Sequence, residues 1–116
     1  MSHYLDPTDK QYTRVYKSET PEILKAFNEF NAAVFAPEGP ELSLKVRELI
    51  AVAVGITTQC VYCIEAHSKN AAAAGATEKE LAETAWVAAA IRAGGGFAHG
   101  RLAFKFTEGA AAEHTH

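Results

Sequence analysis

The sequence predicts an all-α protein, with one domain of about five to six helices. In several segments apolar residues recur every three to four positions, and proline or glycine separates one segment from the next. No stretch alternates apolar with polar residues as a half-buried strand does. A length of 116 residues and a hydrophobic content of 48% suit one such domain and leave no room for a second.

The first long helix is predicted after Thr20, an N-cap residue, with Pro21 at the first helical position, where a missing N–H costs nothing. Pro37, Gly39 and Pro40 end the helix. The apolar repeat between these signals consists of Ile23, Leu24, Phe27, Phe30 and Val34.

The second helix is predicted after the N-cap residue Ser43, and it is apolar on every side from Leu49 to Ile56. Gly55 and residues 57–59 interrupt it. A helix that is apolar all round must be buried. In so small a chain, burial is easier if another subunit covers one side, so we expect an oligomer.

The third helix is predicted to carry both cysteines of the chain. Thr57 or Thr58 is placed to cap it, which puts Cys60 in its first turn. Gly75 is the expected stop, because glycine readily adopts the left-handed conformation that follows a helix.

The last two helices are separated in the prediction by three glycines. Thr77 and Glu80 have the spacing of a capping box and open the fourth helix, which runs to residues 94–96. Residues 97–106 are expected to form the fifth helix, which carries Phe97, Leu102 and Phe106.

The two ends of the chain show no clean period. Residues 1–19 mix charges with three tyrosines, and we expect an arm that lies on the body or on a neighbouring subunit. Residues 107–116 are Ala-rich and polar without an apolar anchor, so we expect a disordered tail in which His114 and His116 have no catalytic role. The helical domain then spans residues 20–106.

Four residues form a candidate redox site. Cys60, Cys63 and His67 are spaced i, i+3 and i+7, which places all three on one helix face. Glu48 lies on the preceding helix, and a fold-back between the two helices would bring its carboxylate to the same spot. We therefore predict a catalytic group of Glu48, Cys60, Cys63 and His67.

The chemistry of these groups suits thiol oxidation and reduction. Cys60 lies near a helix N-terminus, whose free N–H groups stabilise a thiolate. His67 is four residues after Cys63 and close enough to take its proton, while Glu48 orients the imidazole. The two-residue spacer also permits an internal disulfide, so whichever sulfur attacks first has a resolving partner.

Two other interpretations of the cysteines remain open. Both could be small buried hydrophobic residues, since free cysteine is among the most buried residue types. Alternatively, Cys60, Cys63, His67 and Glu48 have the types and number of a zinc ligand set, and the protein would then be a non-catalytic metal-binding or scaffold protein.

Other polar residues have weaker claims to a role in the site. Glu48 could instead pair with Lys45 or Arg47 at the surface, a contact of little value for stability. Tyr62, between the two thiols, is a candidate binding residue at the entrance of the site. His99 follows the glycine run and is a second candidate for lining the same cavity.

Composition excludes several classes of function. Eleven Lys and Arg residues against 14 Asp and Glu give a net charge of −3, with no basic cluster, so we expect no nucleic-acid partner. The longest apolar run falls far short of the ~20 residues that span a membrane, and no signal-peptide pattern is present. We expect a cytoplasmic protein with no bound cofactor or resident metal.

The candidate site resembles that of the carboxymuconolactone decarboxylase superfamily, and more narrowly its alkylhydroperoxidase D branch. The resemblance rests on Glu48, residues 60–63, His67, residues 71–75 and Thr77, and it covers about residues 20–106. It implies an all-helical, alkylhydroperoxidase D-like subunit that assembles into a homotrimer or homohexamer.

The resemblance also implies an antioxidant activity. Cys60 and Cys63 would cycle through a redox-active disulfide as the protein reduces a hydroperoxide or a partner's disulfide, with Glu48 and His67 carrying protons. A thiol or dihydrolipoyl-type electron donor, or a peroxiredoxin-like partner, would restore the dithiol. The decarboxylases that name the superfamily do not depend on a Cys-x-x-Cys pair, so two thiols favour this peroxidase or disulfide oxidoreductase over decarboxylation.

One residue departs from the family pattern. The best-known peroxidase members carry a histidine immediately before the second cysteine, where this chain has Tyr62. A tyrosine donates a hydrogen bond but is a poor base near neutral pH. A proton relay through that position must therefore be altered or absent.

Overall fold

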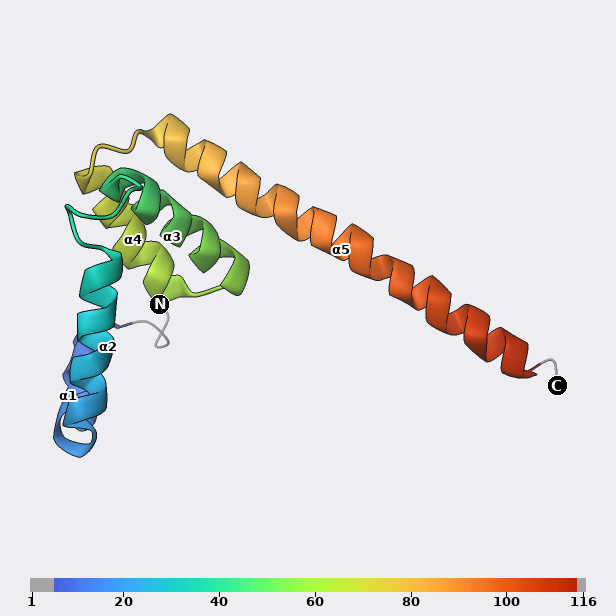
Figure 1. Cartoon of the computed structure of the whole chain (residues 1–116), viewed down its shortest axis with the longest axis horizontal. Helices are drawn as coiled ribbons and strands as arrows, with labels where there is room; N and C mark the ends of the chain where they lie inside the picture. The colour runs from blue at the N-terminus through green and yellow to red at the C-terminus, as the bar shows by residue number, and fades with distance from the viewer. Residues whose placement is uncertain (1–5, 115–116) are drawn as a thin grey trace.

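A computed structural model describes residues 6–114, which form five α-helices and one short 3₁₀ helix and contain no strand (Figure 1). The prediction of an all-α fold is confirmed. In chain order the elements are η1 (Pro7–Tyr12), α1 (Thr13–Glu19), α2 (Pro21–Val34), α3 (Leu44–Thr58), α4 (Val61–Ala73) and α5 (Glu78–His114).

Several helix ends lie where the local signals place them. The Ser43 hydroxyl accepts the N–H of Val46 at 3.2 Å and caps α3. Thr77 and Glu80 form the predicted capping box, with N–H-to-side-chain distances of 2.9 and 3.1 Å. Thr20 precedes α2 as expected, but its hydroxyl donates to a carbonyl of α1 instead of capping α2.

Helix α5 differs most from the prediction. Residues 94–96 do not end it, so the expected fourth and fifth helices are a single helix of 37 residues. Each glycine lowers helix stability by about 1 kcal/mol but keeps its backbone hydrogen bonds, and the alanines around it favour the helix. The same composition continues the helix through residues 107–114, where we expected a disordered tail. His116 lies outside the described residues.

The N-terminal arm is also more regular than expected. Residues 7–19 form η1 and α1, and α1 packs against α2. Residues 1–5 lie outside the described part of the chain. In Figure 1, α1 and α2 extend away from the α3–α4 pair.

Helix α3 is the centre of the fold and packs against both α4 and α5. The most buried apolar side chains are Val52 on α3, Ala71 on α4 and Ala88 on α5. On another side of α3, Ile50 and Val54 are 48% and 53% exposed. The helix that is apolar on every side therefore has one side uncovered in the single chain.

Two polar contacts fix the first half of α5 along α3. Lys45 at the start of α3 binds Glu80 at 2.8 Å, and Arg92 donates to the carbonyl of Thr57 at the end of α3. Beyond this stretch α5 projects away from the other helices (Figure 1). Among residues 6–114, no helix combines the length and the apolar character that crossing a membrane requires.

The Lys45–Glu80 contact predicts a pH-dependent contribution to stability. The hydrogen bond from Lys45, followed by that from the Thr77 N–H, holds the pKa of Glu80 below its ordinary value of 4.5. A carboxylate with a lowered folded-state pKa stabilises the fold above the unfolded pKa and loses this effect as pH falls through the folded pKa. We expect the urea midpoint of the wild type to exceed that of Glu80→Gln at pH 7, and the gap to close on acidification well below pH 4.5.

Glu83→Gln is the matched control for this experiment, because Glu83 is an exposed glutamate on the same helix. A gap between wild type and Glu80→Gln that stayed constant down to pH 2 would contradict the assignment.

Candidate dithiol site

The connection between α3 and α4 places Cys60. Gln59 adopts the left-handed conformation with φ of 59°, and the next N–H, that of Cys60, bonds to the carbonyl of Gly55 at 2.9 Å. The Gln59 N–H bonds to the carbonyl of Ile56 at 3.3 Å. These two bonds form a Schellman motif, which ends α3 and reverses the chain within two residues.

The cap of α4 differs from the prediction. Thr57 and Thr58 belong to the last turn of α3, where both hydroxyls donate to the carbonyl of Val54 at 2.9 Å. Cys60 itself is the N-cap residue, and its sulfur accepts the N–H of Cys63 at 3.2 Å. Gly55 lies inside α3 and does not interrupt it.

The two sulfurs are joined as a disulfide, with their Cα atoms 5.2 Å apart. In the reduced protein, the Cys60 sulfur would remain at the N-terminus of α4, next to the Cys63 N–H. Both the N–H and the positive end of the helix dipole stabilise a thiolate.

Gly55 permits the close approach of α3 to α4 at the dithiol. A Cβ at this position would lie 3.2 Å from the Cβ of Cys63 and 3.4 Å from the backbone N of Ile64. Neither atom can rotate away, because each is part of the α4 backbone or is bonded directly to it. The lack of a side chain at Gly55 therefore sets the spacing between the helices at the site.

We expect Gly55→Ala to destabilise the protein. Overpacking costs about 1–3 kcal/mol, against a gain in helix propensity of about 0.5–1 kcal/mol, so the net loss is about 1 kcal/mol. Urea denaturation measures the change. Gly94→Ala is the matched control, since a Cβ there meets nothing within 4 Å and the gain in propensity should stabilise the helix. Equal stabilisation by both variants would rule out the close contact.

The fold-back of α3 onto α4 brings Glu48 to His67. The Glu48 Oε1 and His67 Nδ1 atoms are 2.6 Å apart, and Glu48 is only 4% exposed. Glu48 is therefore not a surface partner of Lys45 or Arg47. A buried carboxylate bound to one ring nitrogen fixes the orientation of the imidazole.

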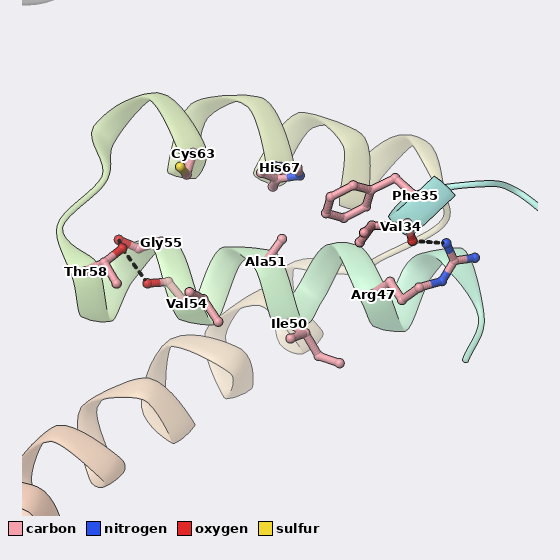
Figure 2. Close-up of a pocket in the computed structure, with 10 residues that line it drawn as sticks. All are labelled: Val34, Phe35, Arg47, Ile50, Ala51, Val54, Gly55, Thr58, Cys63 and His67. Atoms are coloured by element: carbon pink, nitrogen blue, oxygen red, sulfur yellow. Dashed lines mark hydrogen bonds between the residues drawn. The ribbon is translucent and has the colours of Figure 1, made fainter. Parts of the chain in front are cut away.

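Cys63 and His67 line one pocket of about 340 Å³ between α2, α3 and α4. In Figure 2 both side chains extend from α4 toward α3, and the aromatic ring of Phe35 lies beside His67. We call this the dithiol pocket. Its lining is mostly apolar and consists of Val34, Phe35, Arg47, Ile50, Ala51, Val54, Gly55, Thr58, Cys63 and His67.

Two residues of the dithiol pocket have no signal in the sequence. The Phe35 ring stacks on the His67 ring, with centroids 4.8 Å apart and planes at 28°. Arg47 donates to the carbonyls of Val34 at 2.7 Å and Leu42 at 2.9 Å, and so closes the loop that follows α2 (Figure 2). Phe35 lies outside the helical repeat, in a Pro- and Gly-rich stretch whose path depends on this long-range contact.

The two weaker candidates do not line the dithiol pocket. Tyr62 is 54% exposed and faces a second cavity, between α4 and the N-terminal arm. His99 is exposed on the projecting part of α5. Within residues 6–114, no three His, Cys, Asp or Glu residues are grouped so that they could hold a metal ion.

Comparison with known proteins finds two uncharacterised bacterial proteins of similar sequence. Protein 4 in the cox locus of Paracoccus denitrificans, which is uncharacterised, is 45% identical over 78 residues, 67% of this chain and 68% of that protein. An uncharacterised protein of Haemophilus influenzae is 49% identical over 51 residues, 44% of this chain and 43% of that protein.

Two solved structures are similar to this chain in both fold and sequence. A Methanobacterium thermoautotrophicum protein superposes with a TM-score of 0.67 at 38% identity, over 75% of this chain and 98% of that one. Apo-lpg0406, a carboxymuconolactone decarboxylase family protein from Legionella pneumophila, superposes with a TM-score of 0.65 at 30% identity, over 72% and 73% of the two chains. The profile of the carboxymuconolactone decarboxylase family matches residues 21–106, which include the whole dithiol pocket. This chain therefore belongs to the carboxymuconolactone decarboxylase family.

Proposed function

We propose that this protein is a thiol-dependent oxidoreductase of the alkylhydroperoxidase D type, which reduces small hydroperoxides with the Cys60–Cys63 pair. One arrangement carries the proposal. Cys63, bonded to its resolving partner Cys60, lines the same pocket as His67, whose ring is held by the buried Glu48. Nucleophile, resolving thiol, base and orienting carboxylate are thus within one pair of helices.

The reaction begins with the reduced dithiol. His67 takes the proton of Cys63, and the thiolate attacks the terminal oxygen of the hydroperoxide. The O–O bond breaks, Cys63 becomes a sulfenic acid, and the leaving alkoxide takes the proton from His67 and departs as the alcohol. Glu48 stabilises the imidazolium formed between these two proton transfers.

The second half of the reaction forms the disulfide. The Cys60 thiol attacks the sulfenic sulfur, the S–O bond breaks, and the hydroxyl leaves as water with the proton of Cys60. Two electrons have then passed from the dithiol to the hydroperoxide. An external dithiol, of the dihydrolipoyl type or on a peroxiredoxin-like partner, restores Cys60 and Cys63 by exchange.

The pocket favours a small molecule over a partner's disulfide as the oxidant. A volume of about 340 Å³ is at the small end of ligand sites and too small for a protein segment. Its apolar lining suits a hydroperoxide that carries a hydrocarbon group.

Thiol counting tests the proposal directly. Reduced protein is mixed with one equivalent of cumene hydroperoxide, and free thiols and intact mass are measured. We expect loss of both thiols and a mass decrease of about 2 Da, as for an internal disulfide. Two thiols still titratable after the treatment would overturn the proposal, and stoichiometric zinc that survives dialysis would favour the metal-binding alternative.

A further inference from the structure

The single chain leaves far too much surface exposed for a stable monomer. Its accessible surface is 9424 Å², whereas a compact monomer of 12.5 kDa exposes roughly 6,200 Å². Its radius of gyration is 20.4 Å, against about 13 Å for a compact chain of this length. The difference in surface is roughly 3,200 Å² for each chain, at least as much as one partner contributes to an obligate interface of about 2,000–5,000 Å² in total.

A partner that covers this excess surface must be present whenever the chain folds. Val52, Ala71 and Ala88 are the only apolar residues buried in the described part of the chain, so its own core is too small to hold the fold. A second copy of the chain is always present at the same concentration as the first. Symmetric self-association is also the commonest form of oligomer.

Two exposed apolar surfaces match each other in length. The α2 stripe runs along one side of its helix with 4-3-4 spacing and spans about 16 Å. It consists of Ile23, Phe27, Phe30 and Val34, which are 69%, 60%, 66% and 40% exposed. The distal α5 segment, residues 97–106, spans about 14 Å. Its apolar side chains are Phe97 and Phe104 on one side of the helix, which are 73% and 74% exposed, and Leu102 and Phe106 on the opposite side, which are 43% and 68% exposed.

The regions of the chain that contain these two surfaces carry opposite net charge. Residues 21–43, which contain the α2 stripe and the loop after it, have four glutamates against one lysine. The distal α5 segment has Arg101 and Lys105 and no acidic residue. An acidic surface and a basic surface with apolar centres attract each other and disfavour contact of like with like.

We propose that the distal α5 segment of one copy packs on the α2 stripe of a second copy and closes the open side of that copy's dithiol pocket. The α2 stripe ends at Val34, which lines the pocket. Ile50 and Val54 line the same pocket from α3 and are about half exposed in the single chain. A second copy could cover them. The site is therefore complete only in the oligomer, whatever substrate the dithiol reduces.

Photo-crosslinking of the full chain tests this contact. Phe104 is replaced by p-benzoylphenylalanine, the protein is irradiated, and products are separated under denaturing, reducing conditions. We expect a covalent dimer whose crosslink lies in the tryptic peptide 26–45, which contains most of the α2 stripe. The same photoreactive residue at the exposed Lys79, in the first turn of α5, is the control. Because the neighbouring Glu80 binds Lys45 of the same chain, any crosslink from residue 79 to this peptide should lie within one chain and give no covalent dimer.

Three results would overturn the proposal. The wild-type chain could have the mass of a 12.5 kDa monomer in solution. The crosslink could form within one chain, which would mean that α5 bends at residues 94–96 and covers its own α2. Finally, a covalent dimer could carry its crosslinks only outside peptide 26–45.

A variant gives a second, independent readout. Phe104→Glu places a carboxylate opposite the acidic α2 surface, and we expect its mass by light scattering to fall to that of a smaller species. Lys79→Glu adds the same carboxylate on the same helix away from the distal segment and should leave the mass unchanged. An unchanged mass for Phe104→Glu, with retained helical circular dichroism, also contradicts the proposal.

Discussion

Hydroperoxide turnover is expected to fall to the uncatalysed rate in both Cys63→Ser and Cys60→Ser, but the two variants should stop at different stages. Cys60→Ser retains the thiol in the dithiol pocket, reacts once and accumulates a sulfenic acid at Cys63. Cys63→Ser has no sulfur in the pocket and should not react at a comparable rate. A sulfenic-acid trap such as dimedone, read by mass spectrometry, separates the two outcomes.

This order of attack follows from the size of two opposing effects. Cys60 caps α4, and the charge–dipole interaction that favours its thiolate is worth about 0.3–2 kcal/mol. Cys63 lines the pocket together with His67, and correct positioning of a nucleophile against its substrate is worth about 7–11 kcal/mol. Positioning is the larger effect, so we expect Cys63 to attack and Cys60 to resolve.

The two single variants also serve as controls for each other, because these are the only cysteines in the chain. Trapped sulfenic acid at Cys60 in Cys63→Ser, with none at Cys63 in Cys60→Ser, would reverse the order. Full turnover in either variant would exclude a mechanism that uses both sulfurs.

The second large effect is expected at the Glu48–His67 pair. His67→Gln removes the base and acid of the proposed reaction, and we expect kcat/KM for hydroperoxide to fall by about 10²- to 10⁴-fold. Glu48→Gln preserves the shape of the buried side chain but removes the charge that stabilises the imidazolium. It should therefore lower kcat/KM in the same direction while the helical circular dichroism is retained.

Stability distinguishes this pair from a surface contact. In His67→Leu, the buried carboxyl group of Glu48 loses its partner, at a cost of about 3–5 kcal/mol. The double variant Glu48→Leu and His67→Leu should recover much of this loss, because neither polar group is then buried alone. Urea denaturation measures both. Lys45→Ala, which breaks the more exposed ion pair with Glu80, is the control and should cost less than about 1 kcal/mol.

Additive losses in the Glu48 and His67 variants would contradict the coupling between the two side chains. A normal kcat/KM in His67→Gln would remove the imidazole from the mechanism while leaving its structural role intact.

Local signals in the sequence predicted most of the helical framework and half of the site geometry. The caps at Ser43 and Thr77 act within one helical turn, so they can be recognised without knowledge of the rest of the chain. The spacing of Cys60, Cys63 and His67 determines their common face for the same reason. Glu48 could be assigned to the site only with the assumption that α3 folds back on α4.

Signals that act weakly or at long range were less informative. Glycines at residues 94–96 reduce helix propensity but do not forbid a helix, so the predicted break is absent. Thr57 and Thr58 are good cap residues that the structure uses inside α3, because the Schellman motif at Gln59 assigns the cap of α4 to Cys60.

By itself the sequence determined the helical class, the principal caps and the grouping of two thiols and an imidazole on one face, since each depends on interactions within a few residues. The tertiary structure decided the 2.6 Å contact of Glu48 with His67, the stacking of Phe35 and the position of His99 outside the pocket. The first two features depend on the register between antiparallel helices, which is set by the close approach at Gly55 and by the loop that Arg47 closes. The position of His99 follows from the continuation of α5 through residues 94–96. Such contacts join residues far apart in the chain, and only packing brings them together.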